Sequence, residues 1–403
     1  MKKLLFILPQ IPVPPSDGGK QAIYYRIKAV SKEINTSVIM IDINDTMMRE
    51  KDIKKYMPFV KDIKVLPRPS KSIYKSNKFN KFLEVIKWII SGKPRPAQIY
   101  ISKKYRKYIT EYIIKNKIDV VNLEFPFMKE LVDIDFIKKK GSQVKCVFHN
   151  IEHMFYKDIM KMKKIPDIIL NMEINRLKSY EINVIKQCND TACISFYDAE
   201  YYFNEIGYNV KYLPILLNKP LKQWSYNKES NYILFPGSLS FEPNYNGIKW
   251  FCENVWNNFK KKHPDVHLKV TGKIKKEIQN EFSRYKDIVF TGFITNEELE
   301  NLYINSLFVI IPIFKGAGIK IKVIDALSYN VPMIISKLGA QGIFKDDILI
   351  PITDNPRVFE KYMDKLISDK NFCEKMGEIE KELFDSVYDV SNIKRWLDFY
   401  RIG

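Results

Sequence analysis

The chain has 403 residues, enough for two domains of ordinary size, and 46% of them are hydrophobic, which excludes an intrinsically disordered protein. Its formal net charge of +19 favours an anionic partner, which could be nucleic acid, a membrane surface or a substrate. No apolar run reaches the length of about 18 residues that a membrane-spanning helix needs. The five cysteines are scattered without metal-ligand spacing, and such an odd, sparse set is typical of a reducing cytoplasm.

The N-terminal sequence predicts a strand, a loop, a helix and a second strand. The apolar run 3–9 is too short for a signal peptide, and polar Gln10, Ser16 and Asp17 follow it without a cleavage site. We therefore expect a buried strand at 3–9, a helix at 20–32 and a strand at 36–43. The loop between the first strand and the helix ends in the pair Gly18 and Gly19.

Residues 71–117 form the most basic part of the chain. They include thirteen lysines and arginines but only two acidic residues, Glu84 and Glu111. Aromatic and aliphatic residues alternate with the basic ones, which indicates helices that could lie on an anionic lipid surface. The alternative is a solvated basic face whose aromatic residues belong to the core.

A strand at 144–148 is followed by His149-Asn-Ile-Glu-His153, which matches the H-x-x-E-H pattern of zinc sites. A zinc site needs both histidines on one helix face and a third ligand. Because His149 closes a strand, we do not expect that geometry. We interpret His153 as structural.

Further alternation of strands and helices continues to residue 215, so we assign 1–215 to a first domain and the polar segment 216–231 to a linker. A second domain is expected at 232–388, and 389–403 is expected to be a helix that packs back on the first domain. In the second domain, strands at 232–235, 266–271 and 288–291 each end in a glycine loop. These loops carry Gly237 and Ser238, Gly272 and Lys273, and, after Gly292, Phe293 and Ile294.

Residues 307–336 are interpreted as a buried strand, a loop with Gly316 and Gly318, a helix beginning near Ile319, and a second strand. Freed N–H groups at a helix N-terminus bind phosphate well, and Lys320 and Lys322 add positive charge there. An ordinary strand–helix unit with solvated lysines is the alternative. The third glycine of a dinucleotide-binding fingerprint is missing, and no P-loop Gly-Lys-Ser/Thr follows.

The sequence Gly316-Ala-Gly-Ile-Lys-Ile-Lys-Val-Ile-Asp-Ala, followed by Val331-Pro-Met-Ile-Ile-Ser and Gly339-Ala-Gln-Gly, resembles the donor-site signature of family 4 glycosyltransferases. The resemblance implies a GT-B fold, with two doubly wound Rossmann-like α/β domains facing across a cleft. It also implies transfer of a sugar from a nucleotide-sugar with retention of configuration. The two glutamates usual in that family are replaced here by Ala317 and Asp325.

The resemblance also implies which residues act. His149, Lys320 and Lys322 would be catalytic, and Asp325 would hold the ribose. The other donor-binding residues would be Gly18, Gly19, Gly237, Ser238, Gly272, Lys273, Phe293, Ile294, Gly316, Ala317, Gly318 and Ile319. We expect a UDP- or GDP-sugar as donor, no metal or other cofactor, a glycan or lipid-linked acceptor, and a cytoplasmic enzyme held at the inner leaflet by residues 71–117.

Two other functions fit some of these observations. A nucleotide-sugar epimerase or hydrolase of the same fold would share the donor loops. A basic nucleic-acid-binding protein would share the net charge, but no recognisable nucleic-acid-binding motif supports it.

Overall fold

The computed structural model describes residues 2–69, 88, 90–162, 165–316, 318–344 and 349–401. The chain divides into two compact units. The first comprises Met1–Ile215 and Ile393–Gly403, and the second comprises Leu216–Asn392. Within the described residues, no helix combines the length and the apolar character that crossing a membrane requires.

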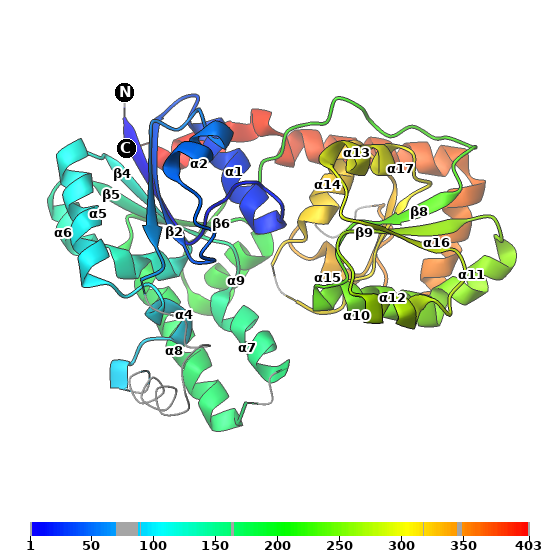
Figure 1. The fold of residues 1–403 in the computed structure, drawn as a ribbon, viewed down its shortest axis with the longest axis horizontal. Helices are drawn as coiled ribbons and strands as arrows, with labels where there is room; N and C mark the ends of the chain where they lie inside the picture. The colour runs from blue at the N-terminus through cyan, green and yellow to red at the C-terminus, as the bar shows by residue number, and fades with distance from the viewer. Residues whose placement is uncertain are drawn as a thin grey trace. The chain divides into compact units, whose positions relative to one another are not determined.

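The first unit is built on a seven-stranded parallel sheet in the order β3-β2-β1-β4-β5-β6-β7 (Figure 1). The strands are β1 Lys3–Leu8, β2 Asn35–Asp42, β3 Asp62–Pro67, β4 Val120–Glu124, β5 Gln143–Phe148, β6 Asp190–Cys193 and β7 Lys211–Tyr212. The helices are α1 Gly18–Val30, α2 Glu50–Tyr56, α4 Arg95–Gln98, α5 Lys103–Asn116, η2 Pro126–Leu131, α6 Ile134–Lys139, α7 Glu152–Met162, α8 Asp167–Gln187, α9 Phe196–Ile206 and α18 Lys394–Tyr400.

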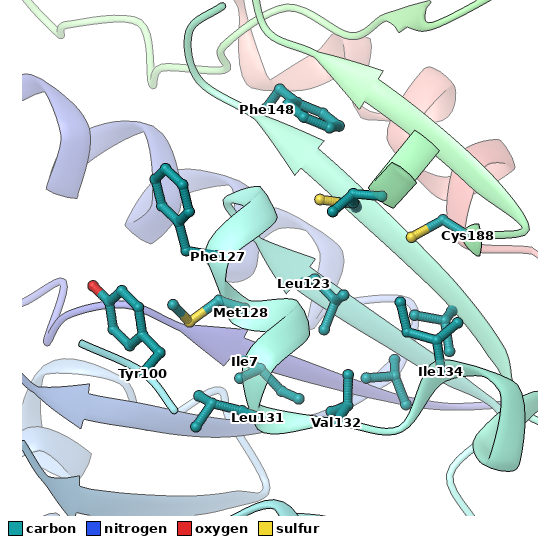
Figure 2. Packing of buried hydrophobic residues seen from close by; sticks show 14 of the residues in the cluster. Ile7, Tyr100, Leu123, Phe127, Met128, Leu131, Val132, Ile134, Phe148 and Cys188 are labelled. Carbon is teal, nitrogen blue, oxygen red and sulfur yellow. The ribbon is translucent and has the colours of Figure 1, made fainter. Parts of the chain in front are cut away.

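The central strands of this sheet are mostly apolar, as expected for parallel strands that helices cover on both faces. Leu5, Ile7 and Leu123 are fully buried. They belong to a core that continues into η2 through Met128 and Leu131, as Figure 2 shows. This packing fixes the carboxyl ends of β1 and β4, where the candidate site of this unit begins.

The second unit has a five-stranded parallel sheet in the order β10-β9-β8-β11-β12. Its strands are β8 Tyr232–Phe235, β9 His267–Thr271, β10 Ile288–Gly292, β11 Val309–Ile311 and β12 Met333–Ile335. Its helices are α10 Glu242–Phe251, η3 Cys252–Trp256, α11 Asn257–Lys262, α12 Lys276–Phe282, α13 Asn296–Ile304, α14 Ile321–Tyr329, α15 Lys337–Ala340, α16 Pro356–Ser368, α17 Lys370–Leu383, η4 Phe384–Tyr388 and η5 Val390–Ile393. The expected two doubly wound α/β units are confirmed.

Several local expectations differ from the structure. The helix expected at 245–262 is two α-helices joined by the π-helical turn η3. The segment 216–231, expected as a linker, packs within the second unit, where the buried Trp224 indole donates a 2.8 Å hydrogen bond to the Ser306 carbonyl. The short helix α18, near the C-terminus, belongs to the first unit. Of the basic segment 71–117, residues 71–87 and Ile89 lie outside the described residues.

Candidate functional site

Both sheets have a point where the chain reverses its direction of travel across the sheet. In the second unit this point lies between β8 and β11, and in the first unit between β1 and β4. In open α/β sheets, ligands bind at the carboxyl ends of the strands on either side of such a switch point. The loops after β8 and β11 carry the Gly237 and Gly316 sequences, and the loop after β1 carries Gly18 and Gly19. Sequence and topology therefore point to the same edges.

In the second unit, Gly237 leaves room for a lysine. Its φ of +144° lies outside the range that side-chain-bearing residues favour. A Cβ at this position would lie 2.6 Å from Lys322 Nζ and 2.7 Å from Asn244 Nδ2. The Gly237 backbone N–H donates a 3.0 Å hydrogen bond to Thr271 Oγ1, which fixes the loop. A larger residue here would displace the lysine head group.

Lys322 connects the loop after β11 with the loop after β8. Its ammonium donates a 2.7 Å hydrogen bond to Asn244 Oδ1, and the Asn244 amide donates to the Ser238 carbonyl at 2.8 Å. The Nζ atom lies 4.5 Å from the centre of the Phe235 ring. A neutral amide and an aromatic face, rather than an ion pair among the described residues, hold the lysine head group, so its protonated form is available to an anionic ligand.

The titration of Lys322 and Asp325 is shifted toward neutral pH. Burial and the charge of Lys320 lower the pKa of Lys322 to about 7, against the opposing effect of Asp325. Burial raises the pKa of Asp325 to about 7, although Lys322 opposes the shift. Within the part of the chain that the structure describes, the Asp325 carboxylate has no hydrogen-bond partner. Groups with such shifted pKa values, here on the helix that follows the loop after β11, are typical of functional sites.

The helix α14 begins two residues later than the sequence predicts, with Lys320 at the N-cap position and no side-chain cap among the described residues. The Lys320 ammonium folds back on its own loop, donating to the carbonyls of Gly316, at 3.2 Å, and Gly318. Gly316 and Gly318 have φ values of +96° and +75°. Ile319 lies between this loop and α14, and Ala317 lies outside the described residues.

The other predicted donor residues of the second unit follow β9 and β10, at the same carboxyl ends of the strands. Gly272 follows β9, and a Cβ on it would lie 2.8 Å from the Ser238 backbone. The Lys273 carbonyl accepts hydrogen bonds from the hydroxyls of Ser238 and Ser240, at 3.2 Å for Ser240. Phe293 follows β10 and is 77% exposed, with Ile294 partly buried beside it in sequence. The exposed ring is suited to stacking on a planar base.

In the first unit, His149 lies at the end of β5 in a network of buried charges. Its Nε2 contacts Glu124 Oε1, and its ring stacks on Phe125 with centroids 4.2 Å apart. The other carboxylate oxygen pairs with Arg26 and accepts a 3.0 Å hydrogen bond from Asn122. Burial raises the pKa of the Glu124 carboxyl, but Arg26 and His149 outweigh burial and lower the pKa to about 2.

The C-terminal helix α18 completes this network. The Arg26 guanidinium lies 4.4 Å from the centre of the Trp396 ring. The Tyr400 hydroxyl donates to Asn122 Oδ1 at 3.3 Å. The Trp396 indole in turn donates to the Pro214 carbonyl at 2.9 Å. The orientation of His149 thus depends on residues from four separate parts of the chain.

The paired glycines of the first unit lie inside the helix rather than before it. Gly18 and Gly19 are the first two residues of α1, which Asp17 caps by accepting a 3.0 Å hydrogen bond from the Lys20 backbone N–H. A Cβ on Gly19 would meet Asp17 at 3.6 Å and Gln10 at 3.9 Å, which are ordinary contacts. The fold of this unit therefore has room for a side chain at Gly19.

The H-x-x-E-H pattern does not bring its histidines together. His149 contacts Glu124, whereas His153, in α7, contacts Glu181 through Nδ1 and the Tyr201 hydroxyl through Nε2, at 2.9 Å. Within the described ranges, no group of three metal-ligating side chains occurs. His153 is held as a structural residue, as the sequence suggested.

Sequence reasoning missed Arg26, Glu124 and Asn244. Arg26 and Glu124 are 98 residues apart in the chain, so no local pattern links them. The available signal was Glu124 at the end of a mostly apolar strand. Asn244 lies in the Pro-Asn-Tyr sequence at the start of α10 and carries no recognisable motif.

Residues 230–369 match the family model described as glycosyl transferases group 1. An uncharacterized 44.6 kDa protein in the cps region of Klebsiella pneumoniae is 21% identical over 357 residues, which cover 85% of this chain and 84% of that protein.

Solved structures with the GT-B fold superpose on the whole chain. Sucrose-phosphate synthase from Thermosynechococcus elongatus does so with a TM-score of 0.68 at 11% identity, covering 99% of this chain and 98% of that one. A mutant of S. aureus TarM in complex with fondaparinux, alpha-GlcNAc-glycerol and UDP gives 0.68 at 12%, covering 100% of both chains. Anabaena HepE in complex with UDP and glucose gives 0.62 at 10%, covering 99% of both. At such identities the likeness shows the fold, which confirms the GT-B expectation.

Proposed function

Because residues 230–369 match the family model of glycosyl transferases group 1, we propose that this chain transfers a sugar from a nucleoside diphosphate to a hydroxyl group of a glycan or lipid-linked acceptor. The transfer proceeds with retention of the anomeric configuration and serves the synthesis of a cell-surface polysaccharide. Two neighbours of the same fold, TarM and HepE, have been solved with UDP. The related Klebsiella protein is described by its position in a cps region.

The observation that carries the proposal is the position of Lys322 at the switch point of the second unit. Its ammonium is held by a neutral amide in the space that Gly237 leaves, in the first turn of α14. The N-terminus of a helix and a lysine together form a site for a diphosphate. They stabilise the negative charge that builds on the leaving diphosphate as the sugar departs.

Asp325 and Phe293 serve the rest of the nucleotide. Asp325 lies one turn after Lys322 on α14, and its carboxyl group can accept hydrogen bonds from the ribose hydroxyls. The exposed ring of Phe293 covers the base. Asp325→Asn should weaken the binding of UDP or GDP while leaving the melting temperature unchanged. A change in melting temperature alone would make Asp325 a structural residue.

The proposed chemistry is an attack of the acceptor hydroxyl on the face that the diphosphate leaves. The bond between the anomeric carbon and the diphosphate oxygen breaks, and the bond to the acceptor oxygen forms on the same face. The acceptor proton passes to the leaving diphosphate. The lysine and the helix N-terminus provide positive charge, so we propose that no metal is required. His149, fixed by Glu124, is the proposed substrate contact on the first unit.

Peripheral association with the inner leaflet remains part of the proposal. In the described part of the basic segment, Lys103, Lys104 and Lys107 lie on α5, but Arg106 donates hydrogen bonds to the Glu130 carbonyl at 3.0 and 3.2 Å. Reversing the charge of the three lysines should release the protein from anionic liposomes at low salt. Equal binding to neutral liposomes would contradict the association.

The test is a panel of UDP- and GDP-sugars incubated with and without an oligosaccharide acceptor mixture, with products identified by mass spectrometry. We expect release of nucleoside diphosphate together with an acceptor that has gained one sugar. Lys322→Ala should lose this activity. The control is Lys361→Ala, which removes an exposed lysine from α16 and should keep it. An epimerised sugar or free sugar, formed at the same rate without acceptor, would instead identify the epimerase or hydrolase alternative.

A further inference from the structure

The first unit contains a groove of about 830 Å³ that shares no residue with the strand-end site. Its walls come from α8, from the end of η2, from the start of α6 and from the segment that precedes α4. Neither the sequence motifs nor the comparisons account for it. Its lining is rich in charged and amide side chains, and the groove is open to solvent.

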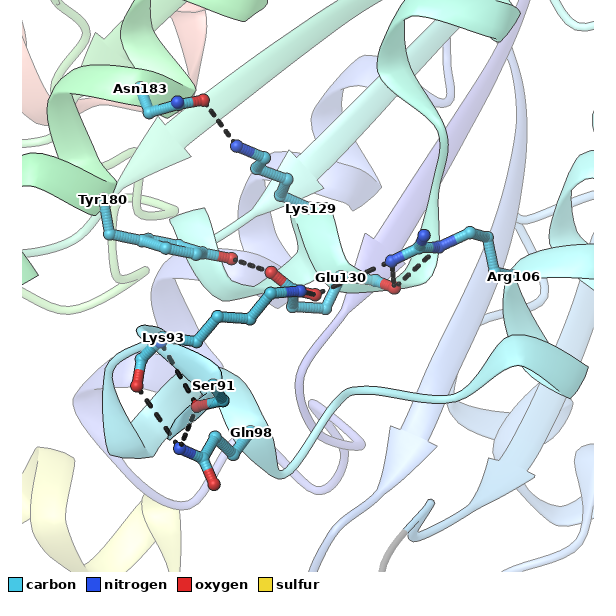
Figure 3. Close-up of polar contacts among 8 residues, drawn as sticks. All are labelled: Ser91, Lys93, Gln98, Arg106, Lys129, Glu130, Tyr180 and Asn183. Carbon is cyan, nitrogen blue, oxygen red and sulfur yellow. Dashed lines mark hydrogen bonds and ion pairs between the residues drawn. The ribbon is translucent and has the colours of Figure 1, made fainter. Parts of the chain in front are cut away.

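The buried carboxylate of Glu130 organises one part of this groove, as Figure 3 shows. It accepts a 3.0 Å hydrogen bond from the Tyr180 hydroxyl and pairs with the Lys93 ammonium. The Arg106 guanidinium lies 3.6 Å from the same carboxylate and also donates to the Glu130 carbonyl. The side chains of Lys93 and Arg106 nevertheless remain 38% and 41% exposed. Glu130 thus fixes two cations while leaving their outer faces to solvent.

This arrangement does not suit a compact anion such as phosphate. A phosphate site needs positive groups that converge on one unoccupied point. Here the point of convergence of Lys93 and Arg106 is already filled by Glu130. The cations can instead make separate contacts with charges that are spread along an extended ligand.

The wall formed by α8 supplies a row of uncharged polar groups. Asn175, Ser179, Asn183 and Gln187 recur at every fourth residue, so they lie along one face of the helix. With a rise of about 1.5 Å per residue, the row extends for about 18 Å. Amide and hydroxyl groups both donate and accept hydrogen bonds, which matches the alternating donors and acceptors of sugar hydroxyls.

Two further cations border this row. Lys129 donates a 2.6 Å hydrogen bond from Nζ to Asn183 Oδ1 (Figure 3). Arg176 lies on α8 among the amides and donates a 3.1 Å hydrogen bond to the Trp88 carbonyl. Of the three acidic lining residues, Glu130 is paired, Asp133 caps α6 by accepting a 3.0 Å hydrogen bond from the Phe136 backbone N–H, and Asp135 is exposed on α6. The described lining thus carries four basic side chains against three acidic ones, two of which already have partners.

We propose that this groove binds an acidic oligosaccharide, an extended acceptor glycan whose carboxylates contact the cations while its hydroxyls contact the α8 row. The assignment of the glycan as an acceptor rests on the proposed glycosyltransferase function. A single-stranded nucleic acid fits less well, because bases need exposed aromatic faces for stacking. Among the described residues that line the groove, the aromatic one is Tyr180, which is buried with its hydroxyl on Glu130.

The test measures binding of a fluorescently labelled oligogalacturonate of about eight sugars, by polarisation and without nucleotide-sugar. Maltooligosaccharide of equal length serves as the neutral probe. We expect the acidic oligomer to bind and the neutral one to bind at least about tenfold more weakly, because charge-assisted contacts are lost. Equal binding of the two oligomers, or no binding of either, would overturn the proposal.

The variants locate the site. Lys129→Gln with Arg176→Gln should weaken binding of the acidic oligomer by about tenfold or more. Lys178→Gln with Lys186→Gln removes the same number of charges from α8 outside the groove and should change it by less than about twofold. Ser179→Trp, which leaves every charge in place, should block the groove sterically. Equal losses in the groove and control variants would contradict the assignment.

Two further measurements exclude other ligands and separate this inference from the proposed function. Pyrophosphate, or anionic vesicles, that displaced the oligomer and lost affinity in the same variants would identify a different ligand and overturn the proposal. UDP and GDP binding is measured in the same samples. Nucleotide binding without oligogalacturonate binding would refute the groove alone, whereas oligogalacturonate binding without any sugar transfer would refute the proposed function alone.

Discussion

The two units present charge at their switch points in opposite ways. In the first unit, Arg26 and Glu124 are buried and neutralise each other, and the pKa of Glu124 falls to about 2. In the second unit, the ammonium of Lys322 is held by the uncharged Asn244 amide, and its pKa falls to about 7. A neutralised pair can orient a neighbour such as His149 but cannot bind an anion strongly. A lysine that is held by a neutral amide can bind an anion in its protonated form.

The glycines differ in the same sense. Gly237 and Gly272 have no room for a Cβ, because the lysine head group and the Ser238 backbone already occupy that space. Gly19 has room. The second unit therefore holds its site together by close internal packing. In the first unit, any requirement for glycine at position 19 would come from a ligand.

The largest expected effect is the loss of Glu124. Glu124→Ala should lower the free energy of unfolding by about 3–5 kcal/mol, because it leaves the buried Arg26 charge without a partner. Chemical denaturation measures the change. Glu111→Ala, an exposed residue of α5 with a 3.9 Å ion pair, is the control and should have little effect. A small loss for Glu124→Ala would show that the network is not needed for the fold.

The low pKa of Glu124 gives this prediction a pH dependence. A carboxyl group whose pKa is lower in the folded state stabilises the protein above its ordinary pKa and loses that contribution as pH falls. Wild-type stability should therefore decline between about pH 4.5, its ordinary value, and about pH 2. The Glu124→Ala variant should show a smaller decline over that interval.

The second effect concerns the unneutralised lysine. Lys322→Ala should weaken UDP or GDP binding by about 10- to 100-fold, as expected for loss of one charge-assisted contact. Lys322 is the charge that opposes the raised pKa of Asp325, so the melting temperature is measured in parallel to separate a loss of binding from a loss of folding. Titration calorimetry measures the affinity, with Lys361→Ala as the control. Unchanged affinity would show that Lys322 does not bind the diphosphate.

A smaller effect follows from the pKa of about 7 for Lys322. A bound diphosphate favours the charged ammonium, so the pKa rises in the complex and nucleotide binding takes up a proton. Affinity should fall by up to about tenfold per pH unit between pH 7 and 9. Lys322→Arg, which stays charged, should remove most of this dependence, whereas Asp325→Asn should retain a decline. A flat wild-type profile would contradict the shifted pKa.

The smallest effect on stability is expected at Gly19. Gly19→Ala should change the free energy of unfolding by no more than about 1 kcal/mol, because the new methyl group meets only ordinary contacts. Gly272→Ala, at a φ of +89° and 2.8 Å from the Ser238 backbone, should be clearly destabilising. If Gly19→Ala keeps its stability but loses transfer activity, the glycine is required by a ligand.

The sequence predicted the elements whose signals are local. The apolar strands β1, β8 and β11 were found within a few residues, because a parallel strand buried on both faces is a continuous apolar run. The edge strand β3 was missed, since Asp62 and Lys64 interrupt its apolar pattern. The π-turn η3 was missed because helical periodicity does not distinguish it from an α-helix.

The candidate site was predictable where one loop carries several of its residues, as around Gly316 and Lys322. It was not predictable where side chains meet across the sheet. Arg26 and Glu124 come from different strand–helix units, and Asn244 reaches Lys322 across 78 residues of sequence. The groove beside Glu130 was not predictable either, because its walls come from separate elements of the first unit.

The assignment of the diphosphate site to Lys322 and the start of α14 is tested most directly by a crystal structure with UDP or GDP, whichever binds more tightly. We expect diphosphate oxygens within hydrogen-bond distance of Lys322 Nζ and of the backbone N–H groups that begin α14, with the ribose hydroxyls at Asp325. A diphosphate bound elsewhere, with Lys322 still donating only to Asn244, would contradict the account.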